Sequence, residues 1–148
     1  MKRIAALAIV VAITLFTPHA LGAAKRSYAG TFATSGTLKF AVEKNRNGKK
    51  VVNFRFEDFP LSCESGPEAV TGEFTYAVRV RRGKFDTVAI DQTREGEVRA
   101  KLRLEGRLLG KANAEGSLKI AGRKVLVEPR RREDCTSPNT PWTAARER

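Results

Sequence analysis

Residues 98–105 read VRAKLRLE, and in this stretch apolar and charged side chains alternate at every position. A period of two places Val98, Ala100, Leu102 and Leu104 on one face of a β-strand and the charged side chains on the other. A helix would scatter the same residues around its circumference. The stretch therefore predicts a strand with one buried side and one solvent-facing side, as in an antiparallel sheet.

The same alternation recurs through much of the chain. It appears at residues 38–43, 52–57 and 70–80, and residues 45–48 and 82–83 supply turn sequences rich in Asn and Gly. We expect about eight short strands. Regular spacing of short strands predicts an all-β fold, namely a single-domain antiparallel meandering sandwich or barrel.

Two features are expected to end strands. Pro60 has no N–H to donate to a ladder, so the strand before it should stop there. Ala121-Gly122 is predicted to form a hairpin between the strands at residues 117–120 and 124–128.

The register of residues 85–92 is ambiguous. Phe85 has the opposite parity to Val88 and Ile90, so the strand either buries both faces or contains a bulge.

The segment from residue 129 to the C-terminus is polar and interrupted by Pro138 and Pro141. Within this C-terminal tail we expect a terminal strand around Trp142, with the indole covering the core. A short helix capped at Thr140 is the alternative.

The N-terminus reads as a secretory signal peptide. Lys2 and Arg3 precede an uncharged apolar run at residues 4–16, and small residues follow up to Ala23. The run is shorter than the roughly 20 residues that a spanning helix needs. We therefore expect cleavage near Ala23, a secreted or extracytoplasmic β domain at residues 24–148, and no transmembrane segment in it. Cleavage would also remove His19, the only histidine.

Cys63 and Cys135 are the only cysteines. An exported chain enters an oxidising compartment, so this pair predicts a disulfide. Two free thiols, one of them a nucleophile, are the alternative, but no histidine would remain to deprotonate a thiol.

Several short motifs carry a resemblance. They are Tyr28-Ala29-Gly30-Thr31, Phe54-Arg55-Phe56 before Cys63-Glu64-Ser65-Gly66, Gly83-Lys84-Phe85, and Cys135 followed by Trp142-Thr143-Ala144-Ala145-Arg146. In this order the chain resembles a group of small exported all-β proteins of unknown function from high-GC Gram-positive bacteria. The resemblance implies an extracytoplasmic β domain with a disulfide and implies no activity.

The residue inventory argues against most catalytic sites. Without a histidine there is no Ser-His triad, and no metal site or cofactor motif is expected. We therefore expect a non-enzymatic protein. The alternative is a carboxylate-dependent hydrolase acting on an extracellular carbohydrate through Asp91 and Glu97, which face each other across a predicted hairpin.

The formal net charge of +12 is the strongest functional hint. Basic residues on the outward parity of two strands and at the turn between residues 81 and 84 would form a polyanion-binding stripe if the strands share a sheet face: Arg79, Arg81, Arg82, Lys84, Arg99, Lys101 and Arg103. The expected partner is an anionic cell-wall polymer or lipid headgroups. A purely solubilising role for these charges is the other interpretation.

No specific nucleic-acid binding is expected. The aromatic residues fall on the apolar parity of their strands, which places them in the core instead of on a base-stacking surface: Phe32, Phe40, Phe54, Phe56, Phe74, Tyr76 and Phe85.

Overall fold

The computed structural model describes residues 24–92, 98–128 and 131–148, and all regular elements in them are β-strands. The predicted signal peptide lies outside these residues. The strands are β1 (Ala24–Phe32), β2 (Thr37–Asn45), β3 (Gly48–Cys63), β4 (Gly66–Phe74), β5 (Val78–Val80), β6 (Lys84–Gln92), β7 (Val98–Leu109), β8 (Asn113–Glu128), β9 (Arg131–Thr136) and β10 (Thr140–Arg146). The predicted all-β class is confirmed.

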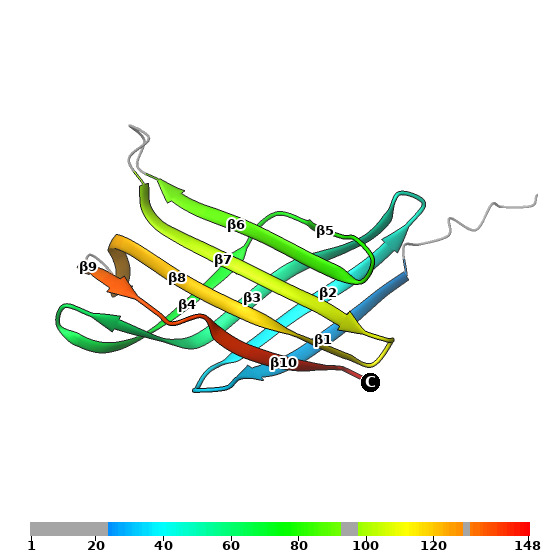
Figure 1. The fold of residues 1–148 in the computed structure, drawn as a ribbon, viewed down its shortest axis with the longest axis horizontal. Helices are drawn as coiled ribbons and strands as arrows, with labels where there is room; N and C mark the ends of the chain where they lie inside the picture. The colour runs from blue at the N-terminus through cyan, green and yellow to red at the C-terminus, as the bar shows by residue number, and fades with distance from the viewer. Residues whose placement is uncertain (1–23, 93–97, 129–130) are drawn as a thin grey trace, which may run out of the picture.

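Six strands close into an antiparallel barrel in the order β1, β2, β3, β9, β8, β10, because β10 pairs with both β8 and β1. The 16-residue strands β3 and β8 pair along both edges. β3 carries β4 and β5 on its outer edge, and β8 carries β7 and then β6. Figure 1 shows β6, β7 and β8 side by side in one layer and β1, β2 and β3 in the other. Of the two expected architectures, the chain adopts a barrel with extra strands.

Two predicted strand ends are wrong. Pro60 pairs with Ala69, and β3 continues through it to Cys63. Ala121-Gly122 does not form a hairpin, because β8 runs unbroken through it. At Gly122 an added Cβ would lie 2.3 Å from the carbonyl oxygen of Arg99 on β7. Glycine is needed there for the close approach of two strands, not for a turn.

The alternation predicted to run through residues 70–80 is broken in its middle. β4 ends at Phe74 and β5 begins at Val78. Tyr76, predicted to lie in the core, is 43% exposed, and its hydroxyl lies 3.0 Å from Oγ1 of Thr87. The break divides one expected strand into two and contributes to the larger strand number.

The register of β6 follows neither prediction, burial of both faces or a bulge. Its pairing with β7 is regular from Lys84 to Asp91, and only one face is buried. Phe85 lies in the core, whereas Val88 and Ile90 are 51% and 46% exposed. β6 is the last strand on its side of the sheet, and no described element covers its outward face.

Two bulges set the inward residues of β3. Asn53 and Asp58 have positive φ angles of 53°, so the side-chain alternation slips at each of them. Val51 instead of Val52 is therefore fully buried, and both Phe56 and Phe59 point into the core although three positions separate them.

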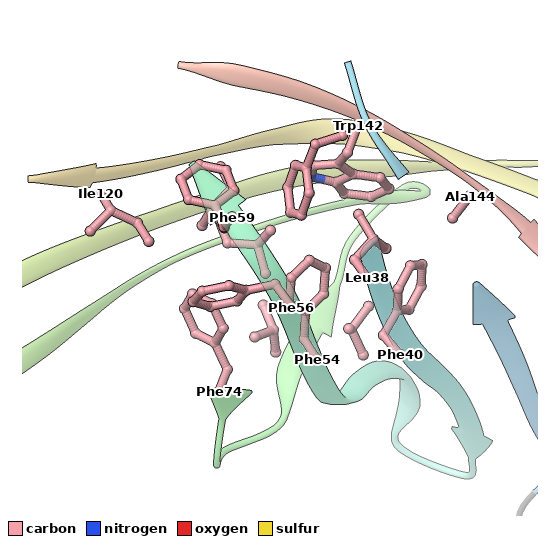
Figure 2. Close-up of a cluster of buried hydrophobic side chains, with 14 of the residues drawn as sticks. Leu38, Phe40, Phe54, Phe56, Phe59, Phe74, Ile120, Trp142 and Ala144 are labelled. Carbon is pink, nitrogen blue, oxygen red and sulfur yellow. The ribbon is translucent and has the colours of Figure 1, made fainter. Parts of the chain in front are cut away.

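The core is largely aromatic. Figure 2 shows Phe40, Phe54 and Phe56 with Trp142, which is 1% exposed. The ring centroids of Phe40 and Phe54 lie 5.9 and 6.0 Å from that of Trp142. The terminal strand predicted around Trp142 is confirmed as β10, which lies between β1 and β8.

A disulfide joins Cys63 at the end of β3 to Cys135 on β9, as predicted. Nearby, the backbone N–H and the hydroxyl of Ser65 both donate to Oε2 of Glu133, at 3.2 and 2.6 Å. The disulfide and these hydrogen bonds fix the β3–β4 hairpin to β9.

Candidate polyanion-binding end of the barrel

Three hairpins and the first and last described residues lie together at one end of the molecule. The β2–β3 turn, the β5–β6 turn and the β7–β8 turn lie there, together with the start of β1 and the end of β10, on the right of Figure 1. These segments are far apart in sequence. We call this region the basic end because of the side chains it gathers, described below.

Turn geometry and a cross-strand hydrogen bond fix the β5–β6 hairpin. Arg81 and Lys84 exchange backbone hydrogen bonds of 2.8 and 2.9 Å, and Arg82 and Gly83 have φ angles of 50° and 79°. This is the two-residue turn with two positive φ angles that suits strand twist. The carbonyl of Gly83 also accepts from the N–H of Leu108 at 2.8 Å, which attaches the hairpin to β7.

The start of β1 and the residues at the end of β10 are attached at the same end of the barrel. The N–H of Arg146 donates to the carbonyl of Ala112 at 2.7 Å, and the N–H of Glu147 donates to the carbonyl of Ser27 at 2.9 Å. The buried Tyr28 hydroxyl donates to the carbonyl of Lys111 at 3.3 Å. The basic end is therefore built on a connected frame instead of free loops.

Basic side chains dominate this end. They are Lys25, Arg26, Lys44, Arg46, Lys49, Lys50, Arg79, Arg81, Arg82, Lys84, Arg107, Lys111, Arg146 and Arg148. The acidic side chains among the same segments are Glu43, Asp86, Glu115 and Glu147. Lys25 forms an ion pair with Glu43 at 3.9 Å and Arg107 with Glu115 at 2.5 Å, which leaves a large cationic excess.

A small hollow of about 140 Å³ opens into the barrel at this end, and we call it the mouth pocket. Tyr28, Val42 and Leu108 contribute apolar surface to it. Four cationic side chains complete its lining, together with Ala24 and Gly110: Arg26 from β1, Lys44 from β2, Lys49 from β3 and Lys111 from the β7–β8 turn. No carboxylate of the described residues lines it.

The strand register concentrates like charges at the mouth pocket. Lys44 and Lys49 are direct cross-strand partners, and Lys44 also pairs with Ala24. Directly opposite residues have Cβ atoms about 5 Å apart, and like charges in such a pair destabilise a sheet. Within the described part of the chain, none of the four cations at the pocket has an ion-pair partner.

A larger hollow of about 670 Å³ lies on the outward side of β6, β7, β8 and β10. Its charges are balanced. Arg107 reaches Oε1 of Glu115 through Nε and Nη2 at 2.6 and 2.5 Å, and Arg103 reaches Oε1 of Glu105 through the same two nitrogens, both at 2.7 Å. With its arginines already engaged, this hollow is a weaker anion site than the mouth pocket.

The basic residues singled out in the sequence divide into two groups. Arg79, Arg81, Arg82 and Lys84 are exposed at the basic end. The others lie on the outward face of β7, where Arg99 is half-buried and Lys101 and Arg103 are exposed. β5 pairs with β3, whereas β7 pairs with β6 and β8, so the two groups lie on strands that are not neighbours in the sheet and do not form one stripe.

Sequence reasoning missed the cations of the mouth pocket: Arg26, Lys44, Lys49 and Lys111. A signal for three of them was present, because Lys44 and Lys49 flank the predicted turn at residues 45–48 and Lys111 follows Gly110. Hairpin turns alternate between the two ends of a barrel, so basic residues beside every second turn can meet at one end. Arg26 carries no such marker.

The carboxylate alternative depends on Asp91 and Glu97, and Glu97 lies outside the described residues. Oδ2 of Asp91 lies 3.5 Å from Nη1 of Arg132. Among the described residues, no group of three His, Cys, Asp or Glu side chains is arranged to hold a metal ion. The described part of the chain also contains no helix long and apolar enough to cross a membrane.

Comparisons with protein-family models, with curated proteins and with solved structures give no match for this chain. The resemblance to exported β proteins therefore stays a prediction.

Proposed function

We propose that this chain is an exported, non-enzymatic β domain that binds anionic polymers of the cell envelope through its basic end. The observation that carries the proposal is the large excess of cations over carboxylates where three hairpins, the start of β1 and the end of β10 meet. Clustered charge of one sign raises the local concentration of a polyanion and speeds its association.

The segregation of positive charge at the basic end favours a binding role over a purely solubilising one. Solubility requires charges of either sign spread over a surface. Here the outward face of β7 mixes signs, with Arg103 beside Glu105, whereas at the basic end cations far outnumber carboxylates. Such segregation costs stability through repulsion, and an anionic partner would offset that cost.

The disulfide and the predicted signal peptide favour a partner outside the cytoplasm, because disulfides persist in oxidising compartments. An anionic wall polymer fits an end-on, multi-cation surface. Anionic lipid headgroups are the competing partner, and the test below separates the two.

The test compares two variants of equal charge in the mature chain on immobilised dextran sulfate. Arg79→Gln/Arg81→Gln removes two charges at the basic end, and Lys101→Gln/Lys119→Gln removes two exposed charges from the outward face of β7 and β8. We expect retention to fall steeply between about 50 and about 200 mM salt. The slope of log affinity against log salt concentration should become shallower by about two for the first variant and should change little for the second.

Equal retention of the two variants would show that net charge alone acts and would refute the basic end as the site. Salt-insensitive retention would refute polyanion binding altogether. Binding to vesicles of phosphatidylglycerol and phosphatidylcholine, without retention on dextran sulfate, would replace the polymer by a lipid surface.

A further inference from the structure

The mouth pocket differs from the rest of the basic end because it is a hollow and not an open surface. Its lining residues come from β1, β2, β3, β7 and the β7–β8 turn, and Tyr28 and Val42 at its base belong to the buried core. A continuous polymer chain cannot pass through a hollow that is closed by the core. Only an end group or a small anion can enter it.

The size of the pocket limits the occupant further. Sites for drug-sized ligands measure about 300–1,000 Å³. The mouth pocket, at about 140 Å³, is well below that range. A tetrahedral oxyanion with its few heavy atoms fits this volume.

The charges of the lining select a highly charged group. Arg26, Lys44, Lys49 and Lys111 lie around the pocket with no ion-pair partner among the described residues, and Lys44 directly faces Lys49 across the strands. A phosphate monoester carries about −1.5 to −2 charges at neutral pH and offers three acceptor oxygens. A phosphodiester or a carboxylate brings about one charge and satisfies fewer of these donors.

We propose that the mouth pocket is a binding site for a single phosphate monoester group, such as the terminal phosphate of an envelope polymer. The inference rests on the proposed function for the polymer, but the site itself would bind small phosphates without it. The dianion would lie between Lys44 and Lys49 and relieve their repulsion, while Arg26 and Lys111 donate to its remaining oxygens.

The primary experiment is calorimetric titration of the mature protein at constant ionic strength with three probes: inorganic phosphate, glycerol 3-phosphate and dimethyl phosphate. We expect the first two to bind at one site per chain and the diester to bind at least tenfold more weakly. Equal affinity for all three would overturn the monoester site.

Variants locate the site. Lys44→Gln/Lys49→Gln should weaken phosphate binding at least tenfold, whereas the matched pair Arg79→Gln/Arg81→Gln, which removes two charges from the same end outside the pocket, should leave it within twofold. An equal loss in both pairs would refute the pocket as the site. A single Lys49→Gln substitution adds a stability readout: its unfolding midpoint should rise without phosphate and should respond less to added phosphate than that of the wild type.

The outcomes separate this inference from the proposed function. Retention on dextran sulfate together with no phosphate binding would overturn the monoester site and leave polymer binding standing. A second outcome is that Lys44→Gln/Lys49→Gln loses phosphate binding while Arg79→Gln/Arg81→Gln and Lys101→Gln/Lys119→Gln are retained equally on dextran sulfate. This outcome would support the pocket and refute the basic end as a polymer surface.

Discussion

Gly116 lies at the centre of a row of inward-facing positions that crosses four strands. The row runs from Phe85 through Gly106 and Gly116 to Trp142, all in cross-strand register. The absence of side chains at the two glycines lets the rings of Phe85 and Trp142 approach to a centroid distance of 6.2 Å at an interplanar angle of 30°. We predict that Gly116→Ala strongly destabilises the barrel.

The expected loss of stability in Gly116→Ala follows from the atoms that an added Cβ would meet. An added Cβ would lie 2.0 Å from the carbonyl oxygen of Glu105, 2.7 Å from Cα of Gly106 and 2.5 Å from Cζ2 of Trp142. Two of these atoms are backbone atoms of β7, so no rotamer change removes them. Ordinary contact begins near 3.4 Å, and β7 would have to move by about 1.4 Å. Overpacking of this kind costs about 3 kcal/mol, at the upper end of the usual range.

The sign of the effect tests the reasoning. Gly116 has an ordinary negative φ, and a Gly-to-Ala change at an uncrowded position of that kind stabilises a protein by about 0.4–1 kcal/mol. Urea unfolding followed by the fluorescence of Trp142, the only tryptophan, measures the difference. Gly72→Ala is the control, because its nearest obstacle is the ring of Phe56, a side chain that can shift. A Gly116→Ala variant as stable as wild type, or no more destabilised than Gly72→Ala, would refute the close-packing argument.

Three further stability predictions concern the disulfide, the core tryptophan and a turn. Replacing both cysteines, Cys63→Ala/Cys135→Ala, should lower the free energy of unfolding by about 4 kcal/mol, because the bridge closes a loop with a sequence separation of 72; a loss below about 1 kcal/mol in urea unfolding would contradict this. Trp142→Ala should cost about 3–5 kcal/mol, but Trp142→Phe should cost clearly less, because the buried indole N–H has no hydrogen-bond partner among the described residues and its removal relieves a desolvation penalty; equal losses in thermal unfolding would count against that view. Arg82→Asn should stabilise the fold by up to about 1 kcal/mol and so raise the melting temperature, since Asn tolerates the positive φ of 50° at the first turn position better than Arg; a lower melting temperature would argue against the two-residue turn.

Local sequence patterns were sufficient where strand alternation continues without a break. Leu38, Phe40 and Val42 point inward as their parity predicts, and so do Ala100 and Leu104 in the stretch at residues 98–105. The turns at residues 45–48 and 82–83 were also readable, because each contains a glycine, and Gly48 and Gly83 take positive φ. The pairing of the cysteines followed from their number and the expected compartment.

Patterns failed where distant strands decide the local geometry. Pro60 and Gly122 look like strand ends, yet the pairing partners of β3 and β8 on both edges carry each strand through them. The bulges at Asn53 and Asp58 move the inward positions of β3, and parity alone does not reveal a bulge. Val88 and Ile90 look like core residues, but their exposure depends on β6 having no neighbour on its outward face.

The charge of the chain shows the same division. The sequence alone determined that the protein is strongly basic and that cations flank its turns. Only the tertiary structure decided that Arg26, Lys44, Lys49 and Lys111 surround one hollow, because strand pairing brings residues from distant parts of the chain to the same end of the barrel. Composition fixes the amount of charge, whereas long-range pairing fixes its position, and the position is what an anionic ligand would recognise.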